Sequence, residues 1–277
     1  MNAERVACLA QAACVLEASA PKPGNVSPGR DFADTSYADF VLSAAAIGPA
    51  LLGVGSSGVG ATVLRAIRDT RRLVRANTNL GLVLLLAPLA RAALSGAGPL
   101  RPRLRSVLDS LTVADARDAY AAIRLASPGG LGTAGREDVA HEPAVSLREA
   151  MMLAADRDSI AREYATHYDL TFGTVMPSLV RARDAGLDWL QAAVEAHLHT
   201  LASVPDTLIA RKKGIEVART VSHRAAAVRD ASGQARKGAL ASLDAWLRSD
   251  GNRLNPGATA DLVGAGLFVA LVEAPET

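Results

Sequence analysis

Apolar residues recur with helical spacing along almost the whole chain, and prolines, glycines and short polar residues interrupt the pattern at intervals. Ser146 and Glu149 form a capping box at one interruption, which marks the start of a helix. Pro205–Gly214 is expected to form one short helix. The other expected helices are Glu4–Ala20, Ser36–Val54, Gly60–Arg75, Leu80–Leu94, Thr112–Leu125, Leu147–Arg162, Tyr164–Asp184, Leu187–Leu201, Gly214–Asp230, Gly238–Arg248 and Ala260–Val272.

Two of the expected helices have no polar face. Leu80–Ala90 is apolar all round, and Leu262–Val272 is similar, with Gly264 and Gly266 allowing another helix to come close. A helix without a polar side has to be surrounded by other helices. We therefore expect these two segments to form the centre of a helical bundle. The residues at their N-terminal ends are of special interest, because a helix N-terminus presents free amides and partial positive charge.

The composition supports an all-α fold. Apolar residues make up 49% of the chain but aromatic residues only 4%, and most of the apolar residues are alanine, leucine and valine. Alanine and leucine favour helices, while the residues that favour strands are scarce. We predict a compact single-domain multi-helix bundle over residues 1–277, with two buried central helices. The segment Leu94–Leu108, which contains glycine, proline and several arginines, is expected to be an exposed excursion.

Charge and cysteine content exclude several classes of function. The chain has 30 Lys and Arg against 28 Asp and Glu, without the basic stripe and stacking aromatics of a nucleic-acid-binding protein. The most apolar stretch, Leu80–Ala90, is shorter than the about 20 residues that cross a bilayer. Cys8 and Cys14 are too few for a disulfide framework or a zinc cluster. Since no secretory signal is visible at the start, we expect a cytoplasmic protein without membrane or nucleic-acid partners.

Small polar residues stand before both central helices. Asn77-Thr78-Asn79-Leu80-Gly81 precedes the first, and Asn255-Pro256-Gly257 with Asp261 opens the second. Capping explains part of each pattern. Three small polar residues in a row exceed what a cap requires, so contact with a ligand is the other interpretation of Asn77 and Thr78. Asp261 is explained equally well by the helix dipole and by metal binding.

The loop Pro21–Asp31 is stiffened by prolines and turned by glycines, so its amides could face a phosphate. Lys22 and Arg30 supply positive charge there. Glu17, Asp31 and Asp34 offer the hard oxygen ligands that magnesium prefers. The alternative is a rigid turn between helices with solvated charges.

Asp156-Arg157-Asp158 is expected to lie in the middle of the helix Leu147–Arg162. Helical spacing places Asp158 in an apolar stripe and Asp156 on the opposite side. A carboxylate in an apolar stripe is costly unless it is paired or bound to a cation. Asp158 is therefore our best candidate for a functional carboxylate, and a buried ion pair with an arginine is the competing interpretation.

Other motifs carry less information. Asp206 opens the short helix Pro205–Gly214, and Arg211, Lys212 and Lys213 close it, which a solvated surface helix would also show. Gly129-Gly130-Leu131-Gly132 does not follow an expected strand, so it is not a dinucleotide-binding fingerprint.

Four motifs together resemble the triphosphoribosyl-dephospho-CoA synthases. They occur in the order and approximate spacing of that family, and the resemblance covers about residues 8–272. They are Pro21-Lys22-Pro23-Gly24, Asn77-Thr78-Asn79-Leu80-Gly81, Pro205-Asp206-Thr207 and Asn255-Pro256-Gly257…Ala260-Asp261-Leu262. The resemblance implies an all-α enzyme that takes ATP and 3′-dephospho-CoA, and displaces adenine from the ribose of ATP with a ribose hydroxyl of the acceptor.

The resemblance and the residue pattern together give a candidate site with Mg²⁺ and ATP. We expect Asp158 and Asp156 to be catalytic, with Asp158 as a base or a further metal ligand. Glu17, Asp31, Asp206 and Asp261 are the expected magnesium ligands. The expected contacts to substrate and phosphate are Lys22, Gly24, Asn77, Thr78, Arg211, Lys212, Asn255 and Gly257.

One motif departs from the family. The well-known branch has Asn-Thr-His-Lys-Gly where this chain has Asn77-Thr78-Asn79-Leu80-Gly81, so a histidine and a lysine are absent. In this the chain resembles a divergent branch found beside tetrahydromethanopterin biosynthesis. Three alternatives to triphosphoribosyl transfer therefore stay open: phosphoribosyl transfer in pterin-type cofactor assembly, hydrolysis of an N-ribosyl bond, and a nucleotide-binding helical scaffold without turnover. The sequence leaves the oligomeric state and the true donor and acceptor open.

Overall fold

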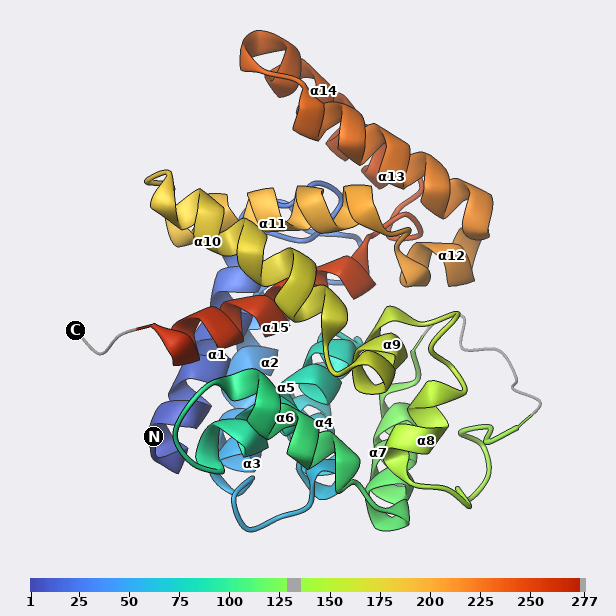
Figure 1. Ribbon diagram of the computed structural model, residues 1–277. Helices are drawn as coiled ribbons and strands as arrows, with labels where there is room; N and C mark the ends of the chain where they lie inside the picture. The colour runs from blue at the N-terminus through green and yellow to red at the C-terminus, as the bar shows by residue number, and fades with distance from the viewer. Residues whose placement is uncertain (129–135, 275–277) are drawn as a thin grey trace.

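Helices form nearly all of the regular structure, as the alanine- and leucine-rich pattern predicts (Figure 1). The computed structural model describes residues 1–128 and 136–274, and this part of the chain contains no β-strand. The loop Gly129–Gly132 thus lies outside the described residues. The helices are α1 (Ala3–Ser19), α2 (Tyr37–Ala46), α3 (Gly48–Leu52), α4 (Val59–Leu73), α5 (Leu80–Leu94), α6 (Leu100–Asp109), α7 (Val113–Ala126), α8 (Leu147–Met152), α9 (Ser159–Thr166), the π-helix η1 (Thr171–Val175), α10 (Met176–Asp184), α11 (Trp189–Ser203), α12 (Thr207–Lys213), α13 (Ile215–Asp230), α14 (Gly233–Arg248) and α15 (Gly257–Glu273).

The two apolar helices, α5 and α15, are the buried centre of the bundle, which confirms the prediction. They pack against each other and against α1, and most of their residues are buried. Glycines of α15 make the packing close. A Cβ atom on Gly264 would lie 2.7 Å from the side chain of Leu82, and one on Gly266 would lie 2.3 Å from Val175. Larger side chains at these positions would force the helices apart.

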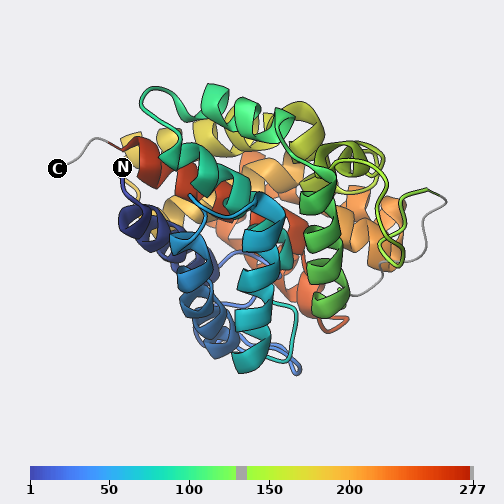
Figure 2. The same ribbon diagram turned by 90° about the horizontal axis from the view of Figure 1, so that it is seen from below.

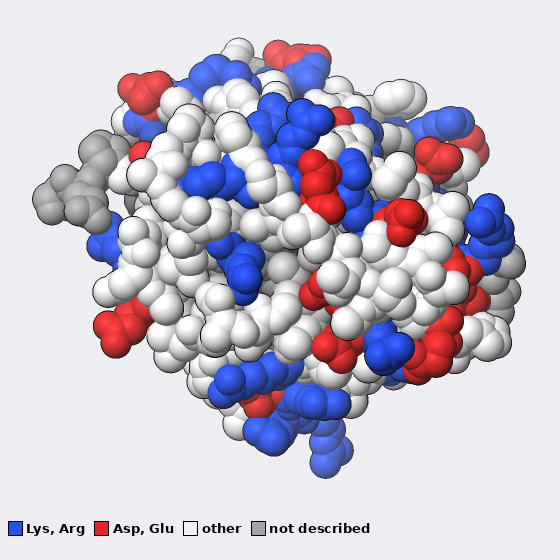
Figure 3. Space-filling model, turned by 60° about the horizontal axis from the view of Figure 1, so that its bottom comes forward, with Lys and Arg blue, Asp and Glu red and all other residues white. Residues whose placement is uncertain are grey.

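A second, smaller apolar cluster lies under α11 to α14, and the α13–α14 pair extends to the top of the molecule in Figure 1. Val194 of α11 packs against both this cluster and the main core, so the two are continuous. In the described part of the chain, no helix is long and apolar enough to cross a membrane. The face drawn in Figure 3 carries positive and negative side chains in small mixed groups, in line with the nearly balanced charge.

The prediction that Leu94–Leu108 is an exposed excursion was wrong. Most of it forms α6, in which Leu100, Leu104 and Leu108 are buried. These leucines recur every four residues and therefore share one helix face, which outweighs the glycines and arginines nearby. Arg103 adds to the attachment, because its guanidinium donates to the carbonyls of Ala92, in the last turn of α5, and Gly96, just beyond it, both at 2.8 Å.

Three segments predicted as single helices are interrupted. Ser36–Val54 forms α2 and α3, with Pro49 in the first turn of the second helix. Leu147–Arg162 is divided into α8 and α9 by the turn that contains Asp156–Asp158. In Tyr164–Asp184 the helix ends at Thr166, because His167 and Tyr168 have φ values of 55° and 62°. A periodic apolar pattern continued across each break, so it concealed all three.

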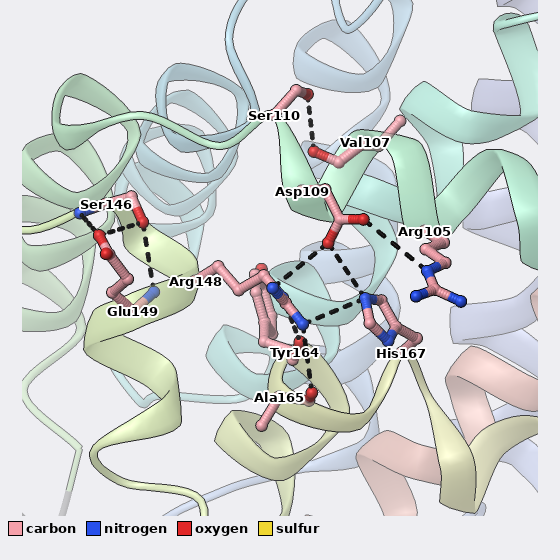
Figure 4. Close-up of polar contacts among 10 residues, drawn as sticks. All are labelled: Arg105, Val107, Asp109, Ser110, Ser146, Arg148, Glu149, Tyr164, Ala165 and His167. Carbon is pink, nitrogen blue, oxygen red and sulfur yellow. Dashed lines mark hydrogen bonds and ion pairs between the residues drawn. The ribbon is translucent and has the colours of Figure 1, made fainter.

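An ion cluster at Asp109 fixes the α8–α9 pair against α6 (Figure 4). The Asp109 carboxylate lies 3.3 Å from Arg148 of α8 and 3.1 Å from His167 at the end of α9. Arg148 also donates to the carbonyl of Tyr164 at 3.3 Å, near the C-terminal end of α9. Because both helices are held at their outer ends, the turn between them has a defined place.

Two tyrosines repair the hydrogen bonding of α5 around Pro88. Proline has no N–H, so the carbonyl of Leu84, four residues earlier, lacks its helical donor. The hydroxyl of Tyr164 donates to that carbonyl at 2.6 Å, and the hydroxyl of Tyr168 donates to the carbonyl of Leu85 at 3.0 Å. Both tyrosines are fully buried. The central helix therefore depends on α9 and the turn after it.

Tyr164→Phe is expected to lower the free energy of unfolding by about 1–3 kcal/mol, because it leaves a buried carbonyl without a donor. Pro88→Ala restores an N–H for Leu84, so the same tyrosine substitution in a Pro88→Ala background is expected to cost much less. Urea unfolding of the four proteins measures this coupling. Equal losses in both backgrounds would show that Tyr164 does not compensate for Pro88.

Glu163 of α9 is a second buried group tied to this turn. Its carboxyl accepts hydrogen bonds from the amides of Leu170 and Thr171, both at 3.0 Å, and from the Thr171 hydroxyl. Burial raises its pKa from 4.5 to about 7, and the hydrogen bonds oppose this rise only in part. The folded protein therefore binds the Glu163 proton more tightly than the unfolded chain does.

Stability is therefore expected to fall as pH rises. The contribution of Glu163 is complete below about pH 4.5 and is lost as the pH passes through about 7. Relative to Glu163→Gln, the free energy of unfolding of the unchanged protein should fall by about 3 kcal/mol across this window. Urea unfolding at a series of pH values checks this, and parallel curves for the two proteins would contradict it.

Candidate functional site

A cavity of about 1100 Å³ lies at the N-terminal ends of the two central helices. Leu80 and Gly81 of α5 and Gly257 and Ala258 of α15 line it, together with residues from the ends of α1 and α4, from α7, from the α8–α9 turn and from α12. Ordinary pockets for one small ligand measure about 300–1,000 Å³. This cavity is therefore large enough for more than one substrate.

The cavity brings together most of the predicted site residues from distant parts of the chain. On its lining lie Glu17, Asn77, Thr78, Asp156, Asp158, Arg211, Lys212, Asn255, Gly257 and Asp261. Four predicted residues do not line it: Lys22, Gly24, Asp31 and Asp206. Each of these four has a partner within the protein, and those partners show how the walls of the cavity are held.

Asp206 joins the starts of α12 and α15. It is 1% exposed, and its Oδ1 accepts the amides of Leu208 and Ile209 at 2.9 and 3.0 Å. Its Oδ2 accepts both the amide and the hydroxyl of Thr259 at 2.8 Å. Both oxygens are occupied by four donors, so in this structure Asp206 positions the wall of the cavity and does not face it.

Lys22 closes the C-terminal end of α1. It is 1% exposed, its Nζ lies 3.0 Å from the Glu17 carboxylate, and it donates to the carbonyl of Glu17 and, at 3.4 Å, to that of Ala20. A cation is favourable at a helix C-terminus, where the carbonyls lack helical donors. Lys22 therefore balances Glu17 from behind the cavity wall.

Gly24 and Asp31 shape the loop after α1. Gly24 has φ +76°, and a Cβ atom there would lie 2.8 Å from Leu247, so both the turn and the close approach require glycine. Its amide donates to Asp244 at 2.8 Å, which ties the loop to α14. Asp31 accepts a hydrogen bond of 2.7 Å from the amide of Tyr37, the first residue of α2.

Asp158 is not in the middle of a helix, and that prediction was wrong. It is the N-cap of α9, where its Oδ1 accepts the amides of Ile160 and Ala161 at 2.8 and 3.2 Å. An aspartate competes with helical hydrogen bonding in this way, so it favours a new helix start over a continuous helix. Its Oδ2 lies 3.2 Å from Nη1 of Arg211. The competing interpretation, an ion pair with an arginine, thus describes one of its contacts.

The short helix α12 carries the basic residues of this wall. Arg211 has a buried Nε without a partner among the described residues. Lys212 donates to the carbonyl of Asn252 at 3.2 Å, and burial followed by the charge of Arg211 lowers its pKa. The amide of Ser159 donates to Thr207 at 3.1 Å, so α9 and α12 also start beside each other.

Asp261 lies between the two central helices. A Cβ atom on Gly81 would lie 2.1 Å from the Oδ2 of Asp261. The amide of Leu82 donates to the Asp261 carboxylate. Burial raises its pKa well above the ordinary value, and the charges of Glu17, Asp206 and Asp158 raise it further. Several carboxylates that repel one another around a cavity are typical of a functional site.

These carboxylates fit a magnesium ion only together with a substrate. Among the described residues no three His, Cys, Asp or Glu side chains are grouped so that they could hold a metal. Magnesium in phosphate-transfer sites commonly takes one or two carboxylates plus substrate phosphates. Glu17 and Asp261, which line the same cavity and repel each other, match that smaller donor set.

The polar residues before α5 serve mainly its start. Asn77 accepts the amide of Leu80 at 3.2 Å, and the hydroxyl of Thr78 lies 2.6 Å from that of Ser43. Asn79 is 7% exposed and donates to Thr70 at 3.1 Å. Capping therefore describes the contacts of Asn77. Asn77 and Thr78 also line the cavity.

Sequence reasoning missed two arginines. Arg71 in the last turn of α4 and Arg75 just after it line the cavity, and neither forms a hydrogen bond or ion pair with any described residue. Nothing in the sequence distinguishes them from ordinary basic residues that complement the end of a helix dipole.

The structure is an all-α bundle with a large cavity lined by acidic and basic side chains at the ends of its central helices. The chain belongs to the family described as CitG: ATP:dephospho-CoA triphosphoribosyl transferase, whose sequence model matches residues 3–277. This agrees with the resemblance found in the motifs.

Two individual proteins illustrate the relationship. The chain is 34% identical over 113 residues to a "Probable 2-(5''-triphosphoribosyl)-3'-dephosphocoenzyme-A synthase" of Pseudomonas syringae pv. tomato, a match that covers 39% of this chain and 38% of that protein. It is also similar to the crystal structure of an Archaeoglobus fulgidus protein provisionally named triphosphoribosyl-dephospho-CoA synthase. There the TM-score is 0.64 and the identity 27%, covering 83% of this chain and 97% of the other.

Asp261→Asn is expected to raise the melting temperature by a few degrees at pH 7, because it removes a buried charge that Glu17 and Asp158 repel. The gain should shrink toward pH 4, since the raised pKa of Asp261 leaves the unchanged protein protonated there. Asp115→Asn is the control. Asp115 is 9% exposed, lies away from the cavity and accepts the amides of Gly60 and Thr112, both at 2.9 Å, so its loss should lower stability. A lower melting temperature for Asp261→Asn would contradict the repulsion.

Proposed function

We propose that the protein transfers the triphosphoribosyl group of ATP to a ribose hydroxyl of 3′-dephospho-CoA and releases adenine. The observation that carries the proposal is the cavity at the ends of α5 and α15, where carboxylates and basic side chains from seven segments of the chain meet. Membership of the family over residues 3–277 supports this choice of substrates.

The reaction breaks the bond between C1 of the ATP ribose and adenine and forms a bond between C1 and the acceptor oxygen. The acceptor hydroxyl loses a proton, and the departing adenine gains one. As in glycoside chemistry, positive charge develops at the ribose carbon in the transition state. Carboxylates such as Asp158 and Asp156 stabilise that charge if they lie near it. We assign proton acceptance to Asp158, because it lines the cavity and its side chain is 28% exposed.

Glu17 and Asp261 are our proposed ligands for Mg²⁺. When bound, the ion would neutralise part of the triphosphate charge and relieve the repulsion between the two carboxylates. Arg211 and Lys212 would hold the phosphates next to it. The buried and unpartnered Nε of Arg211 supports this role, since a buried donor without a partner is costly in the absence of a ligand.

Asn255 and Gly257 would contribute a close approach to the substrate at the start of α15. A Cβ atom on Gly257 would lie 2.7 Å from the side chain of Leu208, so the wall is already tightly packed there. Both cysteines are free, which agrees with our expectation of a cytoplasmic enzyme, where ATP is available and thiols stay reduced.

Phosphoribosyl transfer to a different acceptor is the second candidate. The observation that favours it is the pair Asn79 and Leu80, which stand where the well-known branch has a histidine and a lysine. Leu80 lines the cavity and is 6% exposed, so this part of the wall is apolar and uncharged. An uncharged wall would suit a less anionic donor or an aryl acceptor.

The purified protein, incubated with ATP, Mg²⁺ and 3′-dephospho-CoA, is expected to release adenine in step with consumption of the acceptor, both followed by liquid chromatography. Asp158→Asn and Asp261→Asn should reduce the rate by about 100-fold or more, because each removes a charge from the reacting region. Asp184→Asn is the matched control, since that aspartate is exposed at the end of α10 and does not line the cavity.

Three outcomes would contradict the proposal. Adenine release without the acceptor would indicate a hydrolase of N-ribosyl bonds. ATP binding without any product would indicate a scaffold. Turnover only with phosphoribosyl pyrophosphate and a ribosylated aryl acceptor would favour the second candidate.

A further inference from the structure

Six basic side chains line the cavity wall, and besides Arg136 and Arg157 they form two groups that come from different elements. Arg211 and Lys212 belong to α12, whereas Arg71 lies in the last turn of α4 and Arg75 just after it. In Figure 1, α12 lies above α9 and α4 lies below it, so the two groups approach the cavity from separate sides. A single phosphate chain held at one point would not require both.

The two groups also differ in their surroundings. Arg211 pairs with Asp158, and Lys212 is influenced by the charges of Asp34 and Asp206. The α12 group therefore lies beside Asp158, whose charge also acts on Asp261, one of the two proposed magnesium ligands. Arg71 and Arg75 have no carboxylate partner among the described residues, although seven acidic side chains line the cavity: Glu17, Asp34, Glu137, Asp138, Asp156, Asp158 and Asp261.

Two amides at the starts of the central helices are already used within the protein. The amide of Leu82, in the first turn of α5, donates to Asp261, and the amide of Thr259, in the first turn of α15, donates to Asp206. Both central helices thus direct these N-terminal donors at the protein's own carboxylates. Side chains can supply full positive charge for a further phosphate, and the unpaired arginines are available.

We infer that Arg71 and Arg75 bind the pyrophosphate of the acceptor, 3′-dephospho-CoA, while the α12 group binds the triphosphate of ATP. This assignment rests on the proposed function. Two guanidinium groups match a diphosphate with one negative charge on each phosphate, and arginine binds such oxygens in a bidentate manner. A metal ion is then needed only at the triphosphate, where the carboxylates are.

The part of the wall next to these arginines suits the rest of such an acceptor. Ile123 and Ala126 of α7 and Met151 and Ala154 near α8 line the cavity, and the α4 and α7 helices lie side by side in both ribbon views (Figure 2). An acceptor anchored by its pyrophosphate at the end of α4 would extend its long, partly apolar arm along this surface.

Equilibrium binding separates this inference from the proposed function. Calorimetric titrations with 3′-dephospho-CoA and with ATP plus Mg²⁺ are made on the unchanged protein and on the double variant Arg71→Ala/Arg75→Ala. We expect the dissociation constant for 3′-dephospho-CoA to rise about 30-fold or more, because two charge-assisted contacts are lost. The constant for ATP should change by less than about twofold.

The matched control is Arg68→Ala/Arg72→Ala. This variant also removes two positive charges from the region of α4. Arg68 and Arg72 are exposed, and neither lines the cavity. Arg72 has only an exposed ion pair with Asp69, of little energetic value. This variant should bind both substrates as the unchanged protein does. A loss of acceptor binding in the control would show a general effect of charge and would overturn the assignment.

Other outcomes are equally decisive. If Arg71→Ala/Arg75→Ala weakens ATP binding and spares the acceptor, the two groups have the opposite roles and the inference is wrong. If it spares both substrates, the arginines are solvated surface residues. If the unchanged protein binds neither 3′-dephospho-CoA nor ATP, the proposed function fails first and the inference fails with it.

Discussion

The architecture of the cavity depends on one buried carboxylate, that of Asp206. Its two oxygens accept four hydrogen bonds, two from the start of α12 and two from the start of α15. Because α12 also contacts the start of α9 through Thr207 and Ser159, three helix starts are fixed around one point. Fully satisfied buried polar contacts of this kind specify a single arrangement, whereas a partly satisfied one would be strongly destabilising.

This junction explains how charges of the same sign can be held close together. The charges of Glu17 and Asp158 disfavour the ionised form of Asp261, as the raised pKa of Asp261 indicates. Each is nevertheless held by a fixed partner: Lys22 behind Glu17, Arg211 and helix amides at Asp158, and the amide of Leu82 at Asp261. The fold thus maintains a repulsive arrangement that a bound cation or a positive transition state would relieve. A structure without function would have no reason to keep it.

The sequence predicts the elements that depend on composition and period. The central helix Leu80–Leu94 has the predicted bounds, because an all-round apolar segment between capping residues allows few alternatives. Breaks within periodic segments were not predictable in the same way. In the sequence, Asp158 looks like a carboxylate in an apolar stripe. In the structure its side chain accepts an amide of the next helix and pairs with Arg211, and these contacts make it a helix start.

The same distinction applies to the site. Motifs rich in proline, glycine and asparagine indicated where the chain turns at the cavity, and Asn77, Asp158, Arg211 and Asp261 do line it. Whether a charged residue in such a motif faces the cavity depends on partners far away in the sequence. Lys22 is turned to the end of α1, and the oxygens of Asp206 are taken by α12 and α15, whereas Arg71 and Arg75 face the cavity for lack of any partner.

A consequence for substrate binding follows from this division of roles. Conventional anion sites at helix N-termini use backbone amides, which cannot be removed by substitution. In this protein carboxylates bind the first-turn amides of Leu82 and Thr259, and the side chains of arginines and a lysine are left to bind phosphate. Under the proposed assignment, specificity for a phosphorylated substrate is set by a few replaceable side chains on α12 and at the end of α4. A change of acceptor would then leave the central scaffold unchanged, because the residues that build the junction are separate from those proposed to meet the substrate.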